Sequence, residues 1–298
     1  MTKLLLTGDL HLTDKCPENR VDDYQDTVLR KFRFLFEVAK ERGCDFIIQP
    51  GDFSDSPGLS YEMFVKVISI IKDNHIPIIT TWGQHDLRYR SRSNTFLSAM
   101  ERACNYLHIV TLEKGLEFSG LDIYASAWEE EVPLISSGSN FKVLVTHRMV
   151  VDEKLWQGQE GYQNASPFLR STRFDLIVSG DNHKRFFYST GKRFLFNQGS
   201  LLRSNISQVG HRPSVIVFDI DSISYQEVFV PIEEPEKVFR MEKVMKDKER
   251  NEELDAFVSG LSEHKEMGLS FSDDLSNYLK VNGIKDSIKN IIEECKNG

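Results

Sequence analysis

The sequence predicts an α/β protein whose core is a sandwich of two sheets flanked by helices, with a small helical region at the C-terminal end. Three observations predict this fold class. Apolar runs typical of buried strands alternate with amphipathic helical patterns over the first 82 residues. Shorter strand-like runs follow residue 105, and residues 233–298 carry helical stripes alone. We therefore expect a principal domain over residues 1–232 and a helical region over residues 233–298.

The first segments alternate regularly between strand and helix. Strands and helices are predicted in turn at Lys3–Thr7, Asp22–Arg42, Asp45–Gln49, Tyr61–Asn74 and Ile76–Trp82. The first helix carries an apolar face, and a glycine follows it as a stop signal. Such a βαβαβ order predicts parallel strands joined by right-handed crossovers.

The later segments are shorter and lack long helices between them, so we expect antiparallel strands there. These strands are predicted at Leu121–Ser126, Lys142–Thr146, Asp175–Ser179, Arg185–Ser189, Arg193–Phe196, Ser214–Ile220 and Ile223–Val230. Beyond them, apolar stripes at helical spacing include Leu254, Phe257 and Leu261. These stripes are expected either to pack on the rest of the chain or to dock a partner.

Composition limits the function classes. The net charge of −8 argues against a protein that coats nucleic acid by charge alone, although bound cations would offset the carboxylates of a nuclease. No apolar run approaches the length of a membrane span and no signal peptide is evident, so we expect no membrane association. The four cysteines are scattered, which favours free thiols and a cytoplasmic location.

Polar side chains follow five of the predicted strands, at the point where each strand ends. They are Asp9, His11, Asp52, Asp55, Gln84, His85, Asp86, His147, Asp181 and His183. Ligands of open α/β sheets bind outside the carboxyl ends of the strands, so we expect these residues at one edge. Carboxylates, imidazoles and an amide gathered there suit two divalent metals that clamp a phosphoryl group, with a further histidine protonating the leaving oxygen.

The order of these blocks resembles that of the calcineurin-like metallophosphoesterases. In finer detail, the stretches "DFIIQPGDFSDSP" and "FLFNQGSLLR" resemble the SbcD-like nucleases, the bacterial and phage relatives of the meiotic recombination nuclease. The resemblance covers about residues 3–232. It implies the two-sheet metallophosphoesterase sandwich and a manganese-dependent 3′-to-5′ exonuclease and single-strand endonuclease of DNA repair and recombination. It also implies an SMC-like ATPase partner of the SbcC type.

The same resemblance implies roles for individual residues. The first metal would be held by Asp9, His11, Asp52 and His183. The second would share Asp52 as a bridge and add His147, Gln84 and Asp181. His85 would be the acid that protonates the leaving group, Asp86 would orient or anchor His85 and its loop, and Asp55 would order its own turn.

Two positions depart from the family pattern, and both belong to the second metal. Gln84 stands where asparagine is usual, and Asp181 stands where a histidine is usual. Both still offer oxygen ligands, so we interpret the site as altered but working. Harder oxygen ligands favour manganese or magnesium over zinc.

DNA contacts are expected from basic residues beside the metal loops, although such residues are equally often solvated surface. The candidates are Arg88, Arg90, Arg92, Arg148, Lys184, Arg185 and Arg203. The function predicted is a metal-dependent DNA nuclease, which acts with the ATPase; a homodimer is also considered. The alternatives are a phosphomonoesterase on the same site and a non-catalytic subunit that binds DNA ends through a degenerate second metal site.

Overall fold

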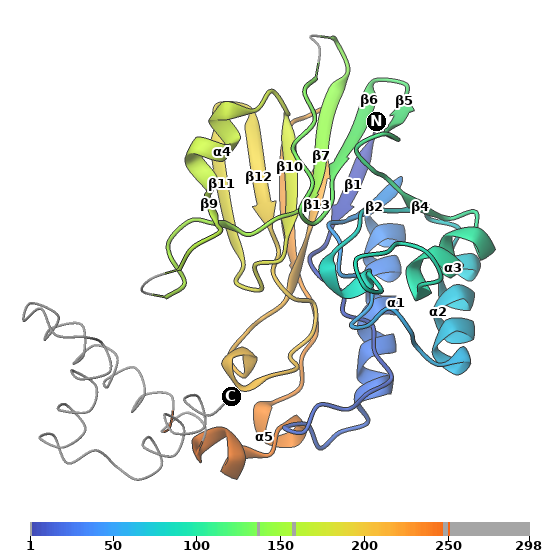
Figure 1. Ribbon diagram of the computed structural model, residues 1–298, viewed down its shortest axis with the longest axis vertical. Helices are drawn as coiled ribbons and strands as arrows, with labels where there is room; N and C mark the ends of the chain where they lie inside the picture. The colour runs from blue at the N-terminus through green and yellow to red at the C-terminus, as the bar shows by residue number, and fades with distance from the viewer. Residues whose placement is uncertain (1, 136–137, 157–158, 247–249, 251–298) are drawn as a thin grey trace, which may run out of the picture. The chain divides into compact units, whose positions relative to one another are not determined.

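The computed structural model describes residues 2–135, 138–156, 159–246 and 250. The chain divides into two compact units, Met1–Val238 and Phe239–Gly298. The first unit contains two six-stranded sheets with helices outside them, which confirms the predicted fold class (Figure 1). The helical stripes predicted beyond residue 250 lie outside the described residues.

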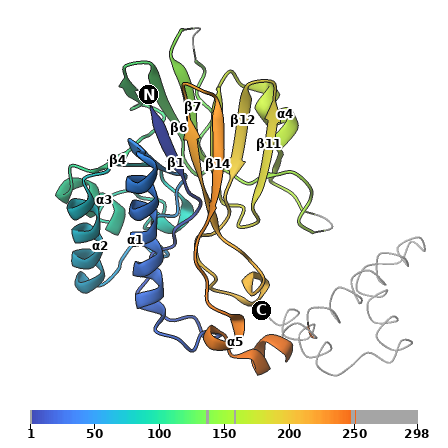
Figure 2. The same cartoon turned by 180° about the vertical axis from the view of Figure 1, so that it is seen from behind.

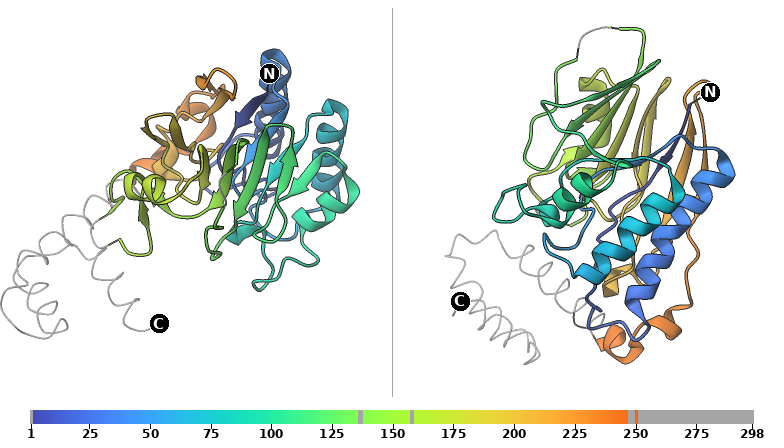
Figure 3. Two further views of the ribbon diagram at one scale, coloured as in Figure 1. Left: turned by 90° about the horizontal axis from the view of Figure 1, so that it is seen from above. Right: turned by 90° about the vertical axis from the view of Figure 1, so that its right-hand side faces the viewer.

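The first sheet holds the four parallel strands of the opening segment and an antiparallel pair from the end of the first unit. Its strands lie in the order β14-β13-β1-β2-β3-β4. Their bounds are β1 Lys3–Leu6, β2 Phe46–Gln49, β3 Ile78–Thr80, β4 Leu107–Ile109, β13 Ser214–Asp219 and β14 Ser224–Phe229. The helices α1 (Tyr24–Arg42), α2 (Tyr61–Asn74) and α3 (Phe96–Ala103) cover its outer face (Figure 3).

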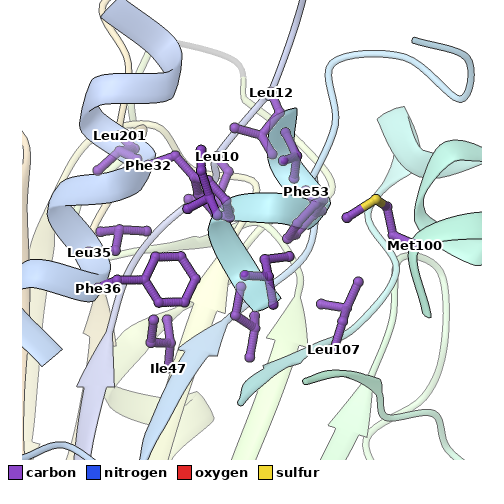
Figure 4. Packing of buried hydrophobic residues seen from close by; sticks show 14 of the residues in the cluster. Leu10, Leu12, Phe32, Leu35, Phe36, Ile47, Phe53, Met100, Leu107 and Leu201 are labelled. Atoms are coloured by element: carbon purple, nitrogen blue, oxygen red, sulfur yellow. The ribbon is translucent and has the colours of Figure 1, made fainter. Parts of the chain in front are cut away.

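The first helix, α1, begins and ends at residues that favour helix termini. The Asp23 carboxylate accepts a hydrogen bond from the Asp26 N–H at 3.0 Å and so caps the N-terminus. At the other end Gly43 adopts a left-handed conformation with φ of 66°, which glycine allows without strain. The apolar face between them is buried, and Figure 4 shows Phe32 and Phe36 packing beside Ile47 of β2.

The second sheet has the order β11-β12-β10-β7-β6-β5. The antiparallel pairing expected of the later strands is confirmed for β11 with β12 and for β13 with β14, but it is wrong for β6, β7, β10 and β12, which run parallel to one another. Loops and one short helix connect these parallel strands. The sequence therefore has no long helical pattern between them that would have predicted parallel pairing. The elements of this half are β5 Leu116–Phe118, β6 Leu121–Ser126, β7 Phe141–His147, β8 Val150–Val151, β9 Gln163–Asn164, α4 Ala165–Ser171, β10 Leu176–Gly180, β11 Phe186–Thr190 and β12 Arg193–Asn197.

The two sheets share an apolar interior. Leu4, Leu6 and Ile48 of the first sheet belong to the same buried cluster as Val145 and Phe196 of the second. The edge strands β11 and β14 lie side by side, where the rings of Phe187 and Tyr225 are 5.4 Å apart (Figure 2). The remaining short elements are the 3₁₀ turns η1 (Gln84–Asp86) and η2 (Ile206–Gln208) and the helix α5 (Pro235–Val238).

Two further expectations concern the described residues. Among them, no helix is long and apolar enough to cross a membrane. Cys16, Cys44 and Cys104 are free thiols, as predicted, and Cys295 lies outside the described part of the chain.

Candidate metal centre

The loops that follow β1, β2 and β12 are bonded to one another at one edge of the sandwich. The His11 N–H donates to the Asp52 carbonyl at 2.9 Å, and the Asp9 N–H donates to the Gly199 carbonyl at 3.0 Å. His11, Asp52 and Asp181 have positive φ angles of 44°, 49° and 75°. Left-handed non-glycine residues cost roughly 1–3 kcal/mol each and cluster at functional sites. The backbone here is therefore held in place by its neighbours rather than by local preference.

One group of ligand atoms is formed by Asp9, His11 and His183. The Nε2 atoms of His11 and His183 face each other at 3.0 Å, and His183 Nε2 lies 3.5 Å from Asp9 Oδ2. His11 Nε2 is also 3.7 Å from Asp52 Oδ2. Two imidazole nitrogens and two carboxylates that converge in this way have the composition of a divalent-metal site.

A second group is formed by Asp9, Asp52 and His147, and all three are buried. The Nδ1–H of His147 donates to the Pro50 carbonyl at 2.9 Å, which leaves Nε2 as the ligating atom, 3.2 Å from Asp52 Oδ2. Among the described residues, Asp9 Oδ1, Asp52 Oδ2 and His147 Nε2 are buried without a hydrogen-bond partner. Because such atoms are costly unless satisfied, the residues present fit divalent cations, and Asp52 Oδ2 lies close to both His11 and His147, so it could serve both positions.

The two residues that depart from the family pattern contact each other. Gln84 Nε2 donates to Asp181 Oδ1 at 3.1 Å, across 97 residues of sequence. The Gln84 Oε1 atom is buried without a hydrogen-bond partner, as are the ligand atoms of the second group. Asp181 is tied to the same cluster, since its N–H donates to Asp9 Oδ2 at 3.0 Å. Both side chains therefore lie beside the candidate metal centre, and the Gln84 amide oxygen remains available to bind a cation.

Known proteins resemble this chain in both sequence and fold. The family model described as calcineurin-like phosphoesterase matches residues 2–185, which is more than half of the chain. The chain belongs to this family. It is also 30% identical over 104 residues to the DNA double-strand break repair protein Mre11 of Aeropyrum pernix, a match that spans 34% of this chain and 25% of that relative.

Two solved structures are also similar. An archaeal phosphodiesterase has a TM-score of 0.44 at 16% identity and covers 76% of this chain and 99% of its own. A dimetal phosphatase from Danio rerio has a TM-score of 0.46 at 11% identity and covers 77% of this chain and 99% of its own.

In this phosphoesterase, His85 is the most exposed histidine of the cluster. Its Nδ1 lies 3.1 Å from the Asp55 carbonyl, so an Nδ1–H there leaves Nε2 available on the open side. Its ring centroid is 4.9 Å from that of His11. His85 also forms a possible ligand group with His11 and Asp52, so the structure is compatible with a role as acid or as ligand.

Asp86 and Asp55 support the cluster from outside. Buried Asp86 accepts hydrogen bonds from the N–H groups of Phe53, Ser54 and Gly83 at 2.9–3.2 Å, which ties the loop after β3 to the loop after β2. Asp55 Oδ1 lies 3.5 Å from His11 Nδ1, so Asp55 contacts a candidate ligand.

Burial and close charges shift the pKa values of the candidate ligands. Burial raises the pKa of Asp9 to about 7. Burial lowers the pKa of His183 to about 4, and the charge of His11 acts in the same direction. Burial also acts to lower the pKa of His147, but the Asp52 carboxylate outweighs it and raises the pKa to about 10. A cation would take the place of the protons that this cluster otherwise holds.

The basic residues proposed for DNA contact divide into two classes. Arg88, Arg90 and Lys184 are exposed. Three others are half-buried and donate hydrogen bonds within the protein. Arg92 donates to the Glu130 carboxylate, Arg148 to the Glu130 backbone carbonyl, and Arg185 to the Glu227 carboxylate, so part of their donor capacity is used there.

One candidate is wrong. Arg203 is 1% exposed and donates to the carbonyls of Val209 and Glu233 at 3.1 and 2.6 Å. It holds the loop after β12 in place and presents no surface to DNA. Sequence position next to the Gly199-Ser200 turn could not distinguish an inward from an outward side chain.

Two supporting residues were missed. Gln49 is fully buried at the end of β2, where its Oε1 accepts from the Gly51 N–H at 3.1 Å. Asn197 at the end of β12 donates to the carbonyls of Asn182 and Lys184 at 2.6 and 2.9 Å, on both sides of His183. The signal available in the sequence was a single amide residue closing an otherwise apolar strand.

Proposed function

We propose that this phosphoesterase is a dimetal phosphodiesterase that hydrolyses DNA, as a manganese-dependent 3′-to-5′ exonuclease and single-strand endonuclease. One observation carries the proposal. Among the described residues, buried carboxylate and imidazole atoms without hydrogen-bond partners converge at Asp9, Asp52 and His147, and the exposed His85 belongs to a neighbouring ligand group. That donor set suits two hard divalent cations and the transfer of a phosphoryl group.

The chain supplies the ligands and a proton donor. Asp9, His11, Asp52 and His183 would hold one ion, and Asp52, His147, Gln84 and Asp181 the other. When bound, two such ions stabilise charge on the phosphoryl oxygens and lower the pKa of a water. His85 contributes the remaining step: its Nε2 holds a proton at the open side and delivers it to the leaving oxygen.

DNA as the substrate is favoured by the exposed cations beside the centre and by the relationship to the Mre11 repair protein. Arg88, Arg90 and Lys184 offer phosphate contacts on either side of the metal loops. The proposal includes a role in repair and recombination, an SMC-like ATPase of the SbcC type as the partner, a homodimer and a cytoplasmic location.

The test compares diesters with monoesters. Linear and plasmid DNA, bis(p-nitrophenyl) phosphate and p-nitrophenyl phosphate are offered with manganese, magnesium or zinc, and metal content is measured in parallel. We expect two metals per chain, cleavage of DNA and of the diester, and the highest rate with manganese.

Three results would redirect the proposal. A preference for the monoester identifies a phosphatase. One metal per chain, no turnover and retained binding of DNA ends identify a non-catalytic subunit. A wild-type rate in Asp52→Ala shows that the dimetal assignment is wrong.

A further inference from the structure

A two-residue turn follows His85 and has an unusual sequence for its conformation. The Arg88 N–H donates to the Ser91 carbonyl at 2.9 Å, and the Ser91 N–H donates to the Arg88 carbonyl at 2.8 Å. Between them Tyr89 and Arg90 have φ angles of 50° and 63°. A two-residue hairpin loop with both residues left-handed favours Asn-Gly, because side chains with larger Cβ groups are strained there.

The turn is fixed at both of its ends. On one side, Asp86 is held by backbone N–H groups of the β2 loop and by that of Gly83. On the other side, the Arg92 guanidinium is paired with Glu130. The left-handed conformation is thus imposed on Tyr89 and Arg90 by their surroundings.

The turn presents an aromatic ring to solvent. Tyr89 is 99% exposed, so its ring contributes almost nothing to the packing of the protein. The Arg90 side chain is 77% exposed; its guanidinium lies 3.5 Å from Glu129 Oε2 in an exposed ion pair and 5.8 Å from the Trp128 ring centroid. Arg88 is exposed as well. The chain therefore keeps a bulky ring between two cations at a position where folding alone favours asparagine.

Tyr89 lies close along the chain to the metal centre. It is four residues from His85, and four residues span at most about 14 Å, so the backbones of the two residues are no farther apart than that. A nucleic acid strand rises about 3.4 Å per nucleotide, so this span corresponds to about four nucleotides. Aromatic rings that stack on successive bases, with cations along the backbone, are the usual means of holding single strands.

We infer that Tyr89 stacks on a base of the DNA strand close to the phosphate that is cleaved, and that Arg88 and Arg90 bind the neighbouring phosphates. This inference rests on the proposed action on DNA and adds a contact that a small diester cannot make. Tyr89 is then a specificity-determining residue, since it favours substrates that carry bases.

The experiment measures kcat/KM on a single-stranded oligonucleotide and on bis(p-nitrophenyl) phosphate with manganese. Stacking on one base changes affinity by about 5- to 150-fold, so Tyr89→Ala should lose that factor on the oligonucleotide and nothing on the small diester. Tyr89→Phe keeps the ring and should retain the wild-type value. On an oligonucleotide with abasic sites near the cleaved end, wild type and Tyr89→Ala should become equal.

A second variant separates the ring from the turn. Tyr89→Asn places a residue that the turn favours at its first position and keeps Arg90, so the fold should be retained or stabilised while cleavage of the oligonucleotide falls. Tyr225→Ala is a control for the loss of a tyrosine ring elsewhere in the fold, at a side chain that is 43% exposed and packs on Phe187. Tyr225 lies opposite Phe218, which pairs with Leu4 near the start of β1, away from the metal loops. This control should leave cleavage unchanged.

The outcomes are separable. If wild type hydrolyses the small diester and leaves DNA intact, the proposed function fails and the inference fails with it. If wild type cleaves DNA and Tyr89→Ala does so equally well, the inference alone is overturned. Equal losses on both substrates would show that the variant disturbs His85, and would also overturn the stacking role.

Discussion

The bond between Gln84 and Asp181 makes a quantitative prediction about the second metal position. The perturbation restores the usual residues of the family, Gln84→Asn and Asp181→His, singly and together. Asparagine is shorter by one C–C bond of about 1.5 Å. The 3.1 Å contact to Asp181 Oδ1 would therefore open to roughly 4.5 Å, beyond hydrogen-bond range. Asp181→His removes the acceptor and breaks the same bond.

Each single change should lose the same interaction. A hydrogen bond to a carboxylate contributes about 1.5–3 kcal/mol, so each variant should unfold more easily by about that amount without metal. Both substitutions break the same hydrogen bond, so the double variant should lose its contribution to the unfolding free energy only once. The two changes should therefore be coupled by about 1.5–3 kcal/mol, measured by urea unfolding of the metal-free protein.

Metal preference supplies an independent measurement on the same variants. The double change replaces a carboxylate with an imidazole, which suits zinc better than manganese. Competition titrations should show zinc binding strengthened relative to manganese, while the number of ligand positions stays the same. DNA cleavage should survive.

Two results would refute this reasoning. Additive unfolding energies would show that the two side chains do not share a bond. Equal metal preference in wild type and double variant would show that neither residue is a ligand. If wild type binds one metal and is inactive while the double variant gains a second metal and activity, the native site is degenerate and the non-catalytic function takes precedence.

Three further predictions follow from the same site and its support. Asp52→Ala should lose both metals, as judged by metal content, because Asp52 Oδ2 lies 3.7 Å from His11 Nε2 of one ligand group and 3.2 Å from His147 Nε2 of the other. His85→Ala should keep two metals and lose about 10²–10⁴ in rate. Burial, together with the nearby charge of Arg203, lowers the pKa of Lys31 to about 7 from its ordinary 10.5, so the unfolded chain binds more protons between these pH values. Stability should rise with pH across that window, and Lys31→Met should remove roughly 3–4 kcal/mol of this rise in urea unfolding at pH 7 and 10.

Each of these has an outcome that counts against it. Two metals retained in Asp52→Ala would remove the bridge. Metal lost from His85→Ala would make His85 a ligand, as its grouping with His11 and Asp52 allows. An unchanged pH slope in Lys31→Met would show that Lys31 stays protonated in the folded protein.

The sequence predicted most of the first sheet because its signals are local. The apolar strands, the amphipathic face of α1 and the glycine at residue 43 each act within a few residues. The strand ends could likewise be read as ligand-bearing, because the edge of a parallel sheet gathers them. The parallel direction of the central strands of the second sheet was missed, since pairing of β7 with β10 depends on contacts across the whole domain.

The same limit applies to side chains at the site. Arg203 and Arg88 are both arginines beside metal loops, yet one is buried and the other exposed. The bond between Gln84 and Asp181 joins positions 97 residues apart, so the sequence could place both at the second metal without revealing that they touch. Burial and pairing are properties of the packed chain, and they decide which polar residues remain available to a ligand.

The glycines before the ligands show why the site is assembled only by the complete sandwich. Gly83 has an ordinary φ of −97°, so its lack of a side chain is not a conformational requirement. A Cβ there would lie 2.1 Å from Asp52 Oδ1, and a Cβ on Gly180 would lie 2.4 Å from Asp9 Oδ1. Each glycine thus leaves room for a carboxylate that arrives from another strand. Gly83 therefore makes room for the Asp52 carboxylate, and Gly180 makes room for the Asp9 carboxylate. Each carboxylate keeps its position because the neighbouring loop has no side chain that would displace it.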